Sequence, residues 1–471
     1  MIKDTLIKNA ELFGVDTLVD VRIKGDRIQQ IATSLLSAPD EHYIDAAGGL
    51  LLPGLHDHHI HLLALAASLE SLSCGPPDIQ SEEDLAALLR EKNREDERGW
   101  IRGIGYHPSV AGDIDRDWLD QHIADRPIRI QHRGGRLWIL NTMALAELGL
   151  SASDTPPGME LIEGRPTGRL LEADRWLRER MNTRPPNLTI ASRLLARYGI
   201  TGITDTTPGN GASEWRLFGE AQANGELLQR VRMMGTPQIQ HCEETAFLRR
   251  GELKIHLLES RLPDFESVAR AIQDAHFNGR SVAVHCVTLT ELVFALSALH
   301  DAGALRGDRI EHASVCPPEQ LQEIQHLGLR VVTQPHFIEE RGDQYLAEVE
   351  LHDQPWLYRA AAFLAADIPL AGGSDAPFGR ADPWQAMAAG VSRKTVSGKV
   401  IGQEEALTPE QALQLFLSPL ERAGGEEIKL AAGSPADLCL LQTSWRLARA
   451  QLHHQLVRAT WRAGQLIYMS G

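Results

Sequence analysis

Residues 50–61 read Leu-Leu-Leu-Pro-Gly-Leu-His-Asp-His-His-Ile-His, an apolar run that passes through Pro53-Gly54 into four histidines. His59 and His61 are two residues apart, so in an extended strand both imidazoles point to the same face and can share one ion. A solvated surface patch of histidines is the alternative, and the apolar strand that precedes them argues against it. The stretch therefore predicts a buried strand that ends in a metal-binding pair.

Seven further apolar runs recur along the chain, and stretches of helical periodicity such as residues 290–299 follow them. Apolar strands that alternate with helices indicate parallel strands buried on both faces, and eight is the number that closes a (β/α)8 TIM barrel. The sequence therefore predicts an α/β fold built on such a barrel. The seven runs are residues 200–207, 228–235, 253–258, 281–287, 309–312, 329–336 and 368–375.

Both ends of the chain read as short strands separated by turns, which predicts one small β-sandwich domain built from both termini. We place this split domain at residues 1–52 and 425–471, and the barrel at 53–424. The gap between the first and second barrel strands is far too long for one helix and contains strand-like and helical segments of its own. We therefore expect a long insertion after barrel strand 1, at about residues 63–187.

Polar side chains follow several of the predicted barrel strands, where the functional residues of such barrels lie. His285, His312 and Asp375 each stand at the C-terminal end of a strand, and Lys254 lies in the fourth strand. Lys254 is the only lysine between residues 92 and 394, and only a lysine amine, not a guanidinium, can lose its proton when buried. A strand-edge lysine that reaches solvent is the alternative. His256, two residues on, shares the face of Lys254 and is either a substrate contact or a core residue.

These motifs together resemble the amidohydrolase superfamily of metal-dependent hydrolases, over nearly the whole chain. The long insertion resembles the branch that includes N-substituted formamide deformylase. The segments that carry the resemblance are Pro53-Gly54-x-x-Asp57-x-His59-x-His61, Lys254, His285, Glu311-His312-Ala313, Gly373-Ser374-Asp375, the residues 432–438, and in the insertion residues 100–103 and 166–173.

The resemblance implies a site with one or two divalent ions, for which we expect Zn²⁺. It implies that His59 and His61 bind one ion, and that His285 and His312 bind a second. It also implies that Lys254 carries a CO₂-derived carbamate that bridges the ions. Asp375 is implied as a ligand of the first ion and as the proton shuttle.

The function that we expect is hydrolysis of a non-peptide, amide-like C–N bond of a small molecule by metal-activated hydroxide, with Asp375 as general base and then general acid. An ester or lactone hydrolase, a phosphoester hydrolase or a ring deaminase could use the same site, and these alternatives stay open. A barrel that has become a binding or scaffold protein would have lost ligands at its strand ends, whereas every ligand position is filled here.

Substrate contacts are harder to predict from the sequence. Arg133 and Arg136 stand where close relatives often carry Asp-Gly-His, and two arginines can bind a carboxylate, although exposed arginine pairs are commoner. His336 follows the seventh strand and either contacts a substrate carbonyl or has a structural role. The candidate substrate contacts are Tyr106, Arg133, Arg136, His256 and His336, with His107 and Trp138 as further pocket walls.

Charge and composition exclude several classes of partner. The net charge of −16 would repel phosphate backbones, so we expect no nucleic-acid partner. No apolar run approaches the roughly 18 residues that span a bilayer, so we expect no membrane partner. The chain opens without the basic and apolar regions of a signal peptide, and its five cysteines are scattered, which predicts a cytoplasmic protein. A homo-oligomer stays open.

Overall fold

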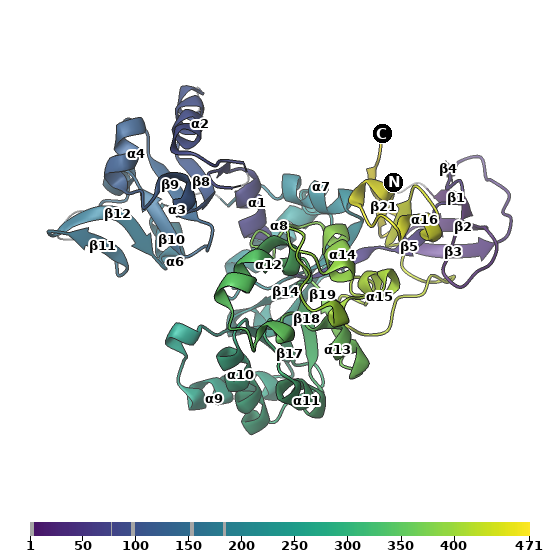
Figure 1. The fold of residues 1–471 in the computed structure, drawn as a ribbon. Helices are drawn as coiled ribbons and strands as arrows, with labels where there is room; N and C mark the ends of the chain where they lie inside the picture. The colour runs from purple at the N-terminus through teal and green to yellow at the C-terminus, as the bar shows by residue number, and fades with distance from the viewer. Residues whose placement is uncertain (1–3, 77, 96–98, 151–154, 182–184) are drawn as a thin grey trace. The chain divides into compact units, whose positions relative to one another are not determined.

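The computed structural model describes residues 4–471 except 77, 96–98, 151–154 and 182–184 (Figure 1). The chain folds into two compact units. One contains the residues up to 62 together with 188–471, and the other contains residues 63–187.

An eight-stranded parallel sheet curls into a nearly closed barrel in the first unit, as predicted. Its strands follow chain order, and the parallel bridge between Ile60 and Ala376 joins the last strand to the first. At the opposite end, the backbone of Leu415 and Phe416 accepts hydrogen bonds from Gly372 and His56, so this segment completes the wall. The strands are β6 (Leu55–Ile60), β13 (Ile200–Asp205), β14 (Arg230–Gly235), β15 (Leu248–His256), β16 (Val282–Cys286), β17 (Arg309–His312), β18 (Arg330–Thr333) and β19 (Leu370–Gly372).

Helices that follow the strands cover the barrel, and their first turns carry the expected caps. Thr288 and Glu291 form a capping box at α10, and the Asp264 side chain caps α9. The helices are α7 (Thr189–Arg197), α8 (Ala212–Ala223), α9 (Phe265–Phe277), α10 (Leu289–Ala302), α11 (Pro318–His326), α12 (Phe337–Glu348), α13 (Ala360–Ala365), α14 (Pro383–Ser392) and α15 (Pro409–Gln414). Short 3₁₀ turns occur at Pro237–His241, Glu259–Arg261, Gln354–Trp356, Gln403–Glu405 and His454–Leu456.

The first predicted strand is in fact two strands that belong to different sheets. β5 (Leu51–Pro53) pairs with a C-terminal strand, and β6 begins at Leu55 in the barrel. Gly54 separates them at a point of close approach, where a Cβ atom would lie 2.2 Å from the Thr201 hydroxyl oxygen of β13. The sequence does not reveal this break, because both strands are buried and together read as one run.

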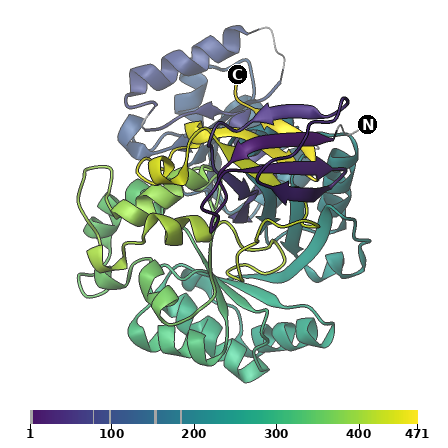
Figure 2. The ribbon, with the colours of Figure 1, turned by 90° about the vertical axis from the view of Figure 1, so that its right-hand side faces the viewer.

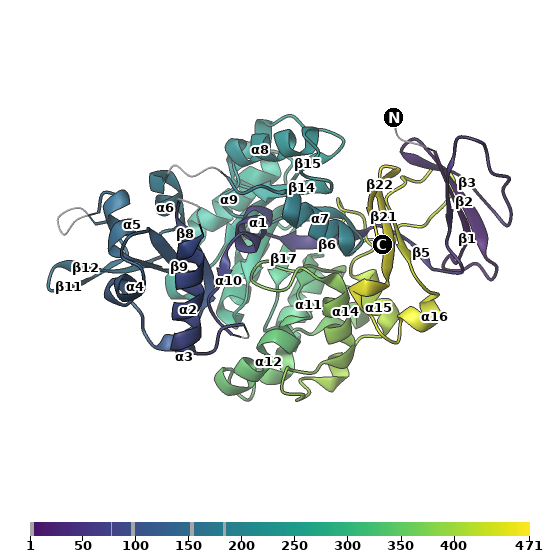
Figure 3. The same ribbon diagram turned by 90° about the horizontal axis from the view of Figure 1, so that it is seen from above.

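Strands from both ends of the chain form two four-stranded sheets, in the orders β3-β2-β1-β4 and β22-β21-β20-β5. The two sheets share one apolar core that includes Ile7 and Trp461, and Figures 2 and 3 show the purple N-terminal strands beside the yellow C-terminal ones. The predicted sandwich from both termini is therefore present. Its elements are β1 (Thr5–Ala10), β2 (Val19–Lys24), β3 (Arg27–Ala32), β4 (His42–Asp45), β20 (Leu438–Leu441), β21 (Val457–Arg462), β22 (Gln465–Met469) and α16 (Trp445–Ala448).

The second unit is built on a six-stranded mixed sheet of order β11-β12-β10-β9-β8-β7. Each face of this sheet has its own apolar core, one with α2, α3 and α4 and the other with α5 and α6 (Figure 3). Its elements are α1 (Leu62–Leu69), which begins at the end of the first unit, β7 (Leu72–Ser73), α2 (Glu82–Arg94), β8 (Ile101–Tyr106), α3 (Pro108–Ala111), α4 (Arg116–His122), β9 (Ile128–His132), β10 (Leu137–Leu140), α5 (Thr142–Glu147), β11 (Met159–Ile162), β12 (Arg165–Leu171) and α6 (Asp174–Met181). Within the described part of the chain, no helix has the length and apolar character to span a bilayer.

Candidate metal centre

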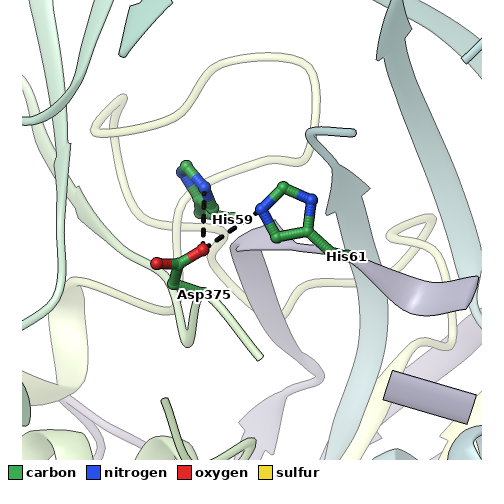
Figure 4. A group of neighbouring side chains, drawn as sticks. All are labelled: His59, His61 and Asp375. Atoms are coloured by element: carbon green, nitrogen blue, oxygen red, sulfur yellow. Dashed lines mark ion pairs between the residues drawn. The ribbon is translucent and has the colours of Figure 1, made fainter. Parts of the chain in front are cut away.

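His59, His61 and Asp375 meet at the C-terminal end of the barrel, where β6 and the segment after β19 lie side by side. The Nε2 atoms of the two imidazoles lie 3.4 Å and 3.2 Å from the same carboxylate oxygen of Asp375 (Figure 4). One ligand atom from each residue lies within 4.8 Å of the others, an arrangement that can hold a metal ion. Two imidazole nitrogens and a carboxylate oxygen suit Zn²⁺ and similar divalent ions.

The backbone between β19 and Asp375 locks this arrangement in place. The Asp375 amide donates to the His59 carbonyl at 2.7 Å, and Asp375 has a left-handed backbone (φ +52°). Gly373 lies so close to β6 that a Cβ atom would be 2.4 Å from the His59 Cβ atom. Asp57 adds a second tie, because its carboxylate accepts from the amides of His59 and Ser374. The glycine and the turn therefore fix the distance between the two strands that carry the cluster.

Glu311 orients His59 from the far side of its ring, a role that the sequence analysis did not assign. Its carboxylate is fully buried on β17, and its two oxygens bind His59 Nδ1 and the Arg309 guanidinium. Because Nδ1 is occupied by a carboxylate, Nε2 is the nitrogen presented to Asp375. A signal was present in the sequence, since Arg309 and Glu311 are two residues apart in a strand and so point to the same face.

Lys254 lies on β15 with its side chain buried, and in the described structure its Nζ atom has no hydrogen-bond partner. Burial lowers the pKa of this amine from its usual value of 10.5. The same electrostatic environment includes Glu311 and Asp375, so the amine belongs to the neighbourhood of the cluster. A buried amine without a partner is unfavourable as an ammonium ion, and its neutral form is the form that could react.

His285 and His312 lie at the C-terminal ends of β16 and β17 and join the same neighbourhood through ring contacts. The His312 ring lies 4.7 Å from that of His59 and 4.4 Å from that of His285. Gln334 occupies His312 Nδ1 at 2.8 Å, and His312 Nε2 is buried with no partner among the described residues. His256, at the exposed end of β15, stacks on His285 at 4.4 Å. The structure thus brings together all six residues predicted as ligands, and only three form the compact cluster.

The electrostatics of the site favour an ionised Asp375 and neutral rings at His256 and His312. At His59 burial opposes the charged ring, but the Glu311 carboxylate outweighs burial and raises the pKa of His59 from its usual value of 6.5. Burial lowers the pKa of His312 to about 3 and that of His256 to about 4. Burial opposes ionisation of Asp375, but hydrogen bonds from His59 and His61 outweigh it and hold the pKa of that carboxyl well below its usual value. An ionised carboxylate and neutral rings are the forms in which such side chains bind metal ions, so His59 would have to release its proton when an ion binds.

Two other candidate substrate contacts, His336 and Tyr106, are each buried within their own unit. His336 is buried at the start of α12, with Nε2 2.9 Å from the Ser374 carbonyl oxygen. In the second unit, Tyr106 packs in an apolar core and donates its hydroxyl to the Gly112 carbonyl at 2.6 Å. Tyr106 is 1% exposed, so it has no free surface for a substrate, and the sequence could not show which side of its strand is covered.

The arginines predicted as substrate contacts lie in the turn between β9 and β10. Arg133 is exposed there, and Arg136 forms an ion pair with Glu172 of its own unit. This pairing provides a carboxylate partner within the protein for Arg136. Of the predicted pocket walls, Trp138 is buried under the Arg102 and Arg129 guanidinium groups, and His107 caps α3.

His56 and His58, the two additional histidines of the opening motif, point away from the cluster. His56 Nδ1 lies 2.7 Å from the Ser418 carbonyl oxygen, and His58 Nε2 lies 3.0 Å from the Ser418 hydroxyl. Both rings are buried, so they anchor β6 to the segment that follows α15. The alternation of β6 therefore separates two anchoring histidines from the two that face Asp375.

A model of the amidohydrolase family matches residues 42–468. The chain belongs to the amidohydrolase family. This membership confirms the resemblance predicted from the sequence and makes the protein a hydrolase. Over the length of this amidohydrolase, an N-substituted formamide deformylase of Arthrobacter pascens is 24% identical, with 93% of each chain covered. A putative amidohydrolase of Bacillus subtilis, YtcJ, is 23% identical over 95% of this chain and 94% of its own.

Among solved structures, an uncharacterized metal-dependent hydrolase from Pyrococcus horikoshii has the same fold as this amidohydrolase. It superposes with a TM-score of 0.78 at 21% identity, and the match covers 96% of this chain and 100% of the other. The likeness extends across the barrel, the sandwich and the insertion, and so supports the architecture described above.

Proposed function

We propose that this amidohydrolase cleaves an amide-like C–N bond of a small molecule with the help of a divalent metal ion. The observation that carries the proposal is the convergence of His59, His61 and Asp375 on one point at the C-terminal end of the barrel. Functional groups of such barrels lie at this end. The deformylase named above acts, by its name, on N-substituted formamides, which supports a C–N bond as the target.

The residues present fit a metal ion. Beside the cluster, two buried polar atoms, Lys254 Nζ and His312 Nε2, have no partner among the described residues. Buried polar atoms usually have a hydrogen-bond partner, so these two nitrogens are available to a bound ligand. His59, His61 and Asp375 would hold one ion, for which we propose Zn²⁺. His285, His312 and a carbamate on Lys254 would hold a second.

When bound, such an ion supplies hydroxide at neutral pH and polarises the carbonyl group of the substrate. Asp375 is ionised, so it can take the proton that the attacking water releases. It can then pass this proton to the leaving nitrogen, which would otherwise depart as an unstable amide anion. The Thr207 hydroxyl lies 3.1 Å from His61 Nδ1 and so orients the ring whose Nε2 lies 3.2 Å from the Asp375 carboxylate.

The test is Asp375→Asn, with the exposed Asp301→Asn on α10 as the matched control. Purified protein is loaded with Zn²⁺, Mn²⁺ or Co²⁺, its metal content is measured, and it is screened against N-formyl and N-acyl amines, lactones and aminopurines. We expect amide hydrolysis by wild type and Asp301→Asn, and a loss of at least a hundredfold in Asp375→Asn. Wild-type turnover in Asp375→Asn would exclude the proton-transfer role. Activity on lactones or aminopurines alone would replace the amide with one of those bonds.

A further inference from the structure

Arg341 carries a partly buried guanidinium that is linked to the candidate metal centre through one residue, Phe378. It lies on α12, which follows the seventh barrel strand, and it donates to the Phe378 carbonyl oxygen. The Phe378 ring contacts the His61 ring edge-on at 5.4 Å, and the Phe378 amide donates to the Asp375 carbonyl at 2.8 Å. Arg341 is therefore tied to the same turn that carries the catalytic aspartate of the proposed function.

No carboxylate within the described residues forms an ion pair with Arg341. The neighbouring Glu340 accepts the Arg380 amide at 3.1 Å and pairs with the Arg380 guanidinium at 4.0 Å. Arg341 instead lies over the Phe337 ring, 3.9 Å from its centre. Guanidinium groups shielded from water usually have an anionic partner. Arg341 therefore has neutral partners, the Phe378 carbonyl and the Tyr345 hydroxyl, and no carboxylate of the described residues in an ion pair, which leaves an anionic ligand as a possible partner.

The surroundings of Arg341 suit an incoming ligand. Tyr345, one turn along α12, brings a hydroxyl to the same face of the helix and lies 3.2 Å from the Tyr358 hydroxyl. The Phe378 side chain is 41% exposed, so this part of the turn is open to solvent within its own unit. The negative charge of Asp375 helps to stabilise the Arg341 cation, which places the two within electrostatic range. A guanidinium with free N–H groups binds a carboxylate through two parallel hydrogen bonds.

We propose that Arg341 binds a carboxylate on the substrate, so that the enzyme prefers amides that carry an acidic group on the nitrogen side. This inference rests on the proposed function, because it assumes that the scissile amide lies at the His59–His61–Asp375 cluster. The exposed Phe378 ring would contact the apolar part of the same substituent. The net charge of −16 repels anionic molecules at long range. Binding of an acidic substrate therefore requires a positively charged group close to the site.

The experiment compares two probes that differ only in one carboxylate, N-formylphenylalanine and N-formylphenethylamine. The variants are Arg341→Met, which removes the charge at similar side-chain length, and Arg341→Lys, which keeps the charge but cannot form two parallel hydrogen bonds to a carboxylate. Arg380→Met is the matched control, since it removes a neighbouring arginine that pairs with Glu340. kcat and KM are measured for each metal-loaded protein, and the affinity of both probes for metal-free protein is measured by calorimetry.

We expect wild type to bind and hydrolyse the carboxylated probe about tenfold to a hundredfold better. Arg341→Met should abolish this preference through KM and affinity and leave the neutral probe within about twofold, whereas a structural role would impair both probes alike. Arg341→Lys should keep only part of the preference, and Arg380→Met all of it. Equal affinity of wild type for both probes, or an unchanged preference in Arg341→Met, would overturn the inference. Selective binding without hydrolysis of any amide would instead refute the proposed function and leave the anion site standing.

Discussion

Replacing Glu311 should weaken metal binding without removing any ligand. The side chain is 0% exposed, and its two oxygens serve His59 and Arg309. Glu311→Ala leaves the Arg309 guanidinium buried without its carboxylate, which costs about 3–5 kcal/mol of unfolding free energy. Glu311→Gln keeps the shape and one acceptor oxygen, so the cost falls to about 1–3 kcal/mol.

The effect on the metal should be visible in Glu311→Gln because that variant stays folded. Loss of the carboxylate behind a metal-binding imidazole lowers metal affinity about tenfold to a hundredfold, or about 1.4–2.7 kcal/mol. Competition with a chromophoric chelator measures Zn²⁺ affinity, and thermal melts of the metal-free protein measure stability. The matched control is Glu323→Gln, which removes an exposed carboxylate that also faces a histidine, His300, at 3.2 Å.

Glu323→Gln should change stability by less than about 0.5 kcal/mol and leave Zn²⁺ affinity at the wild-type value. If Glu311→Gln binds Zn²⁺ as tightly as this control, then Glu311 does not orient His59 for a metal, and the reasoning above is refuted.

Three further predictions concern the same end of the barrel. Lys254→Ala should lose activity, and added formate or acetate should restore part of it if a carboxylate group is what the lysine supplies; equal activity with and without these acids would exclude the carbamate. Gly373→Ala should lower both stability and Zn²⁺ content because its Cβ atom would lie 2.4 Å from that of His59, whereas Gly209→Ala, with no atom within 4 Å, should match wild type in melts and metal analysis. In metal-free protein, His312 has a pKa of about 3 against about 6.5 when unfolded, so the unfolded state binds more protons between these values. Its contribution should be complete above about pH 6.5 and should fall by about 1.4 kcal/mol per unit as the pH drops toward 3, so the pH dependence of unfolding free energy should be steeper by this amount in wild type than in His312→Gln, as measured by denaturant unfolding.

The barrel could be predicted from the sequence because its strands are largely buried and read as short runs that are apolar apart from a few polar residues. His59, His61 and Asp375 could be placed together because the C-terminal ends of parallel strands meet at one rim. Partners across the barrel could not be predicted in the same way. Nothing local to Glu311 shows that its carboxylate meets an imidazole 252 positions earlier in the chain.

In the insertion, too, the contacts of single side chains could not be predicted from the sequence. Tyr106 ends a strand, and an aromatic side chain there can equally face a ligand or a core. Which applies depends on the side of the sheet on which α2, α3 and α4 pack, and this packing is not visible in the pattern of the strand itself. Likewise, the sequence around Arg136 does not show that this side chain forms an ion pair with Glu172. Strand ends are therefore readable from local patterns, whereas the fate of a single polar or aromatic side chain depends on long-range packing.

The single glycine between β5 and β6 also bears on how the enzyme is made. β5 pairs with β20, whose residues are about 390 positions further along the chain. Only Gly54 lies between β5 and β6, the strand that carries His59, so the position of β5 restricts that of β6. Contacts of such long range form late and slowly. During synthesis, the strand that carries the first metal ligands should therefore not reach its final position until β20 has left the ribosome, and a chain cut short of β20 should accumulate without bound metal.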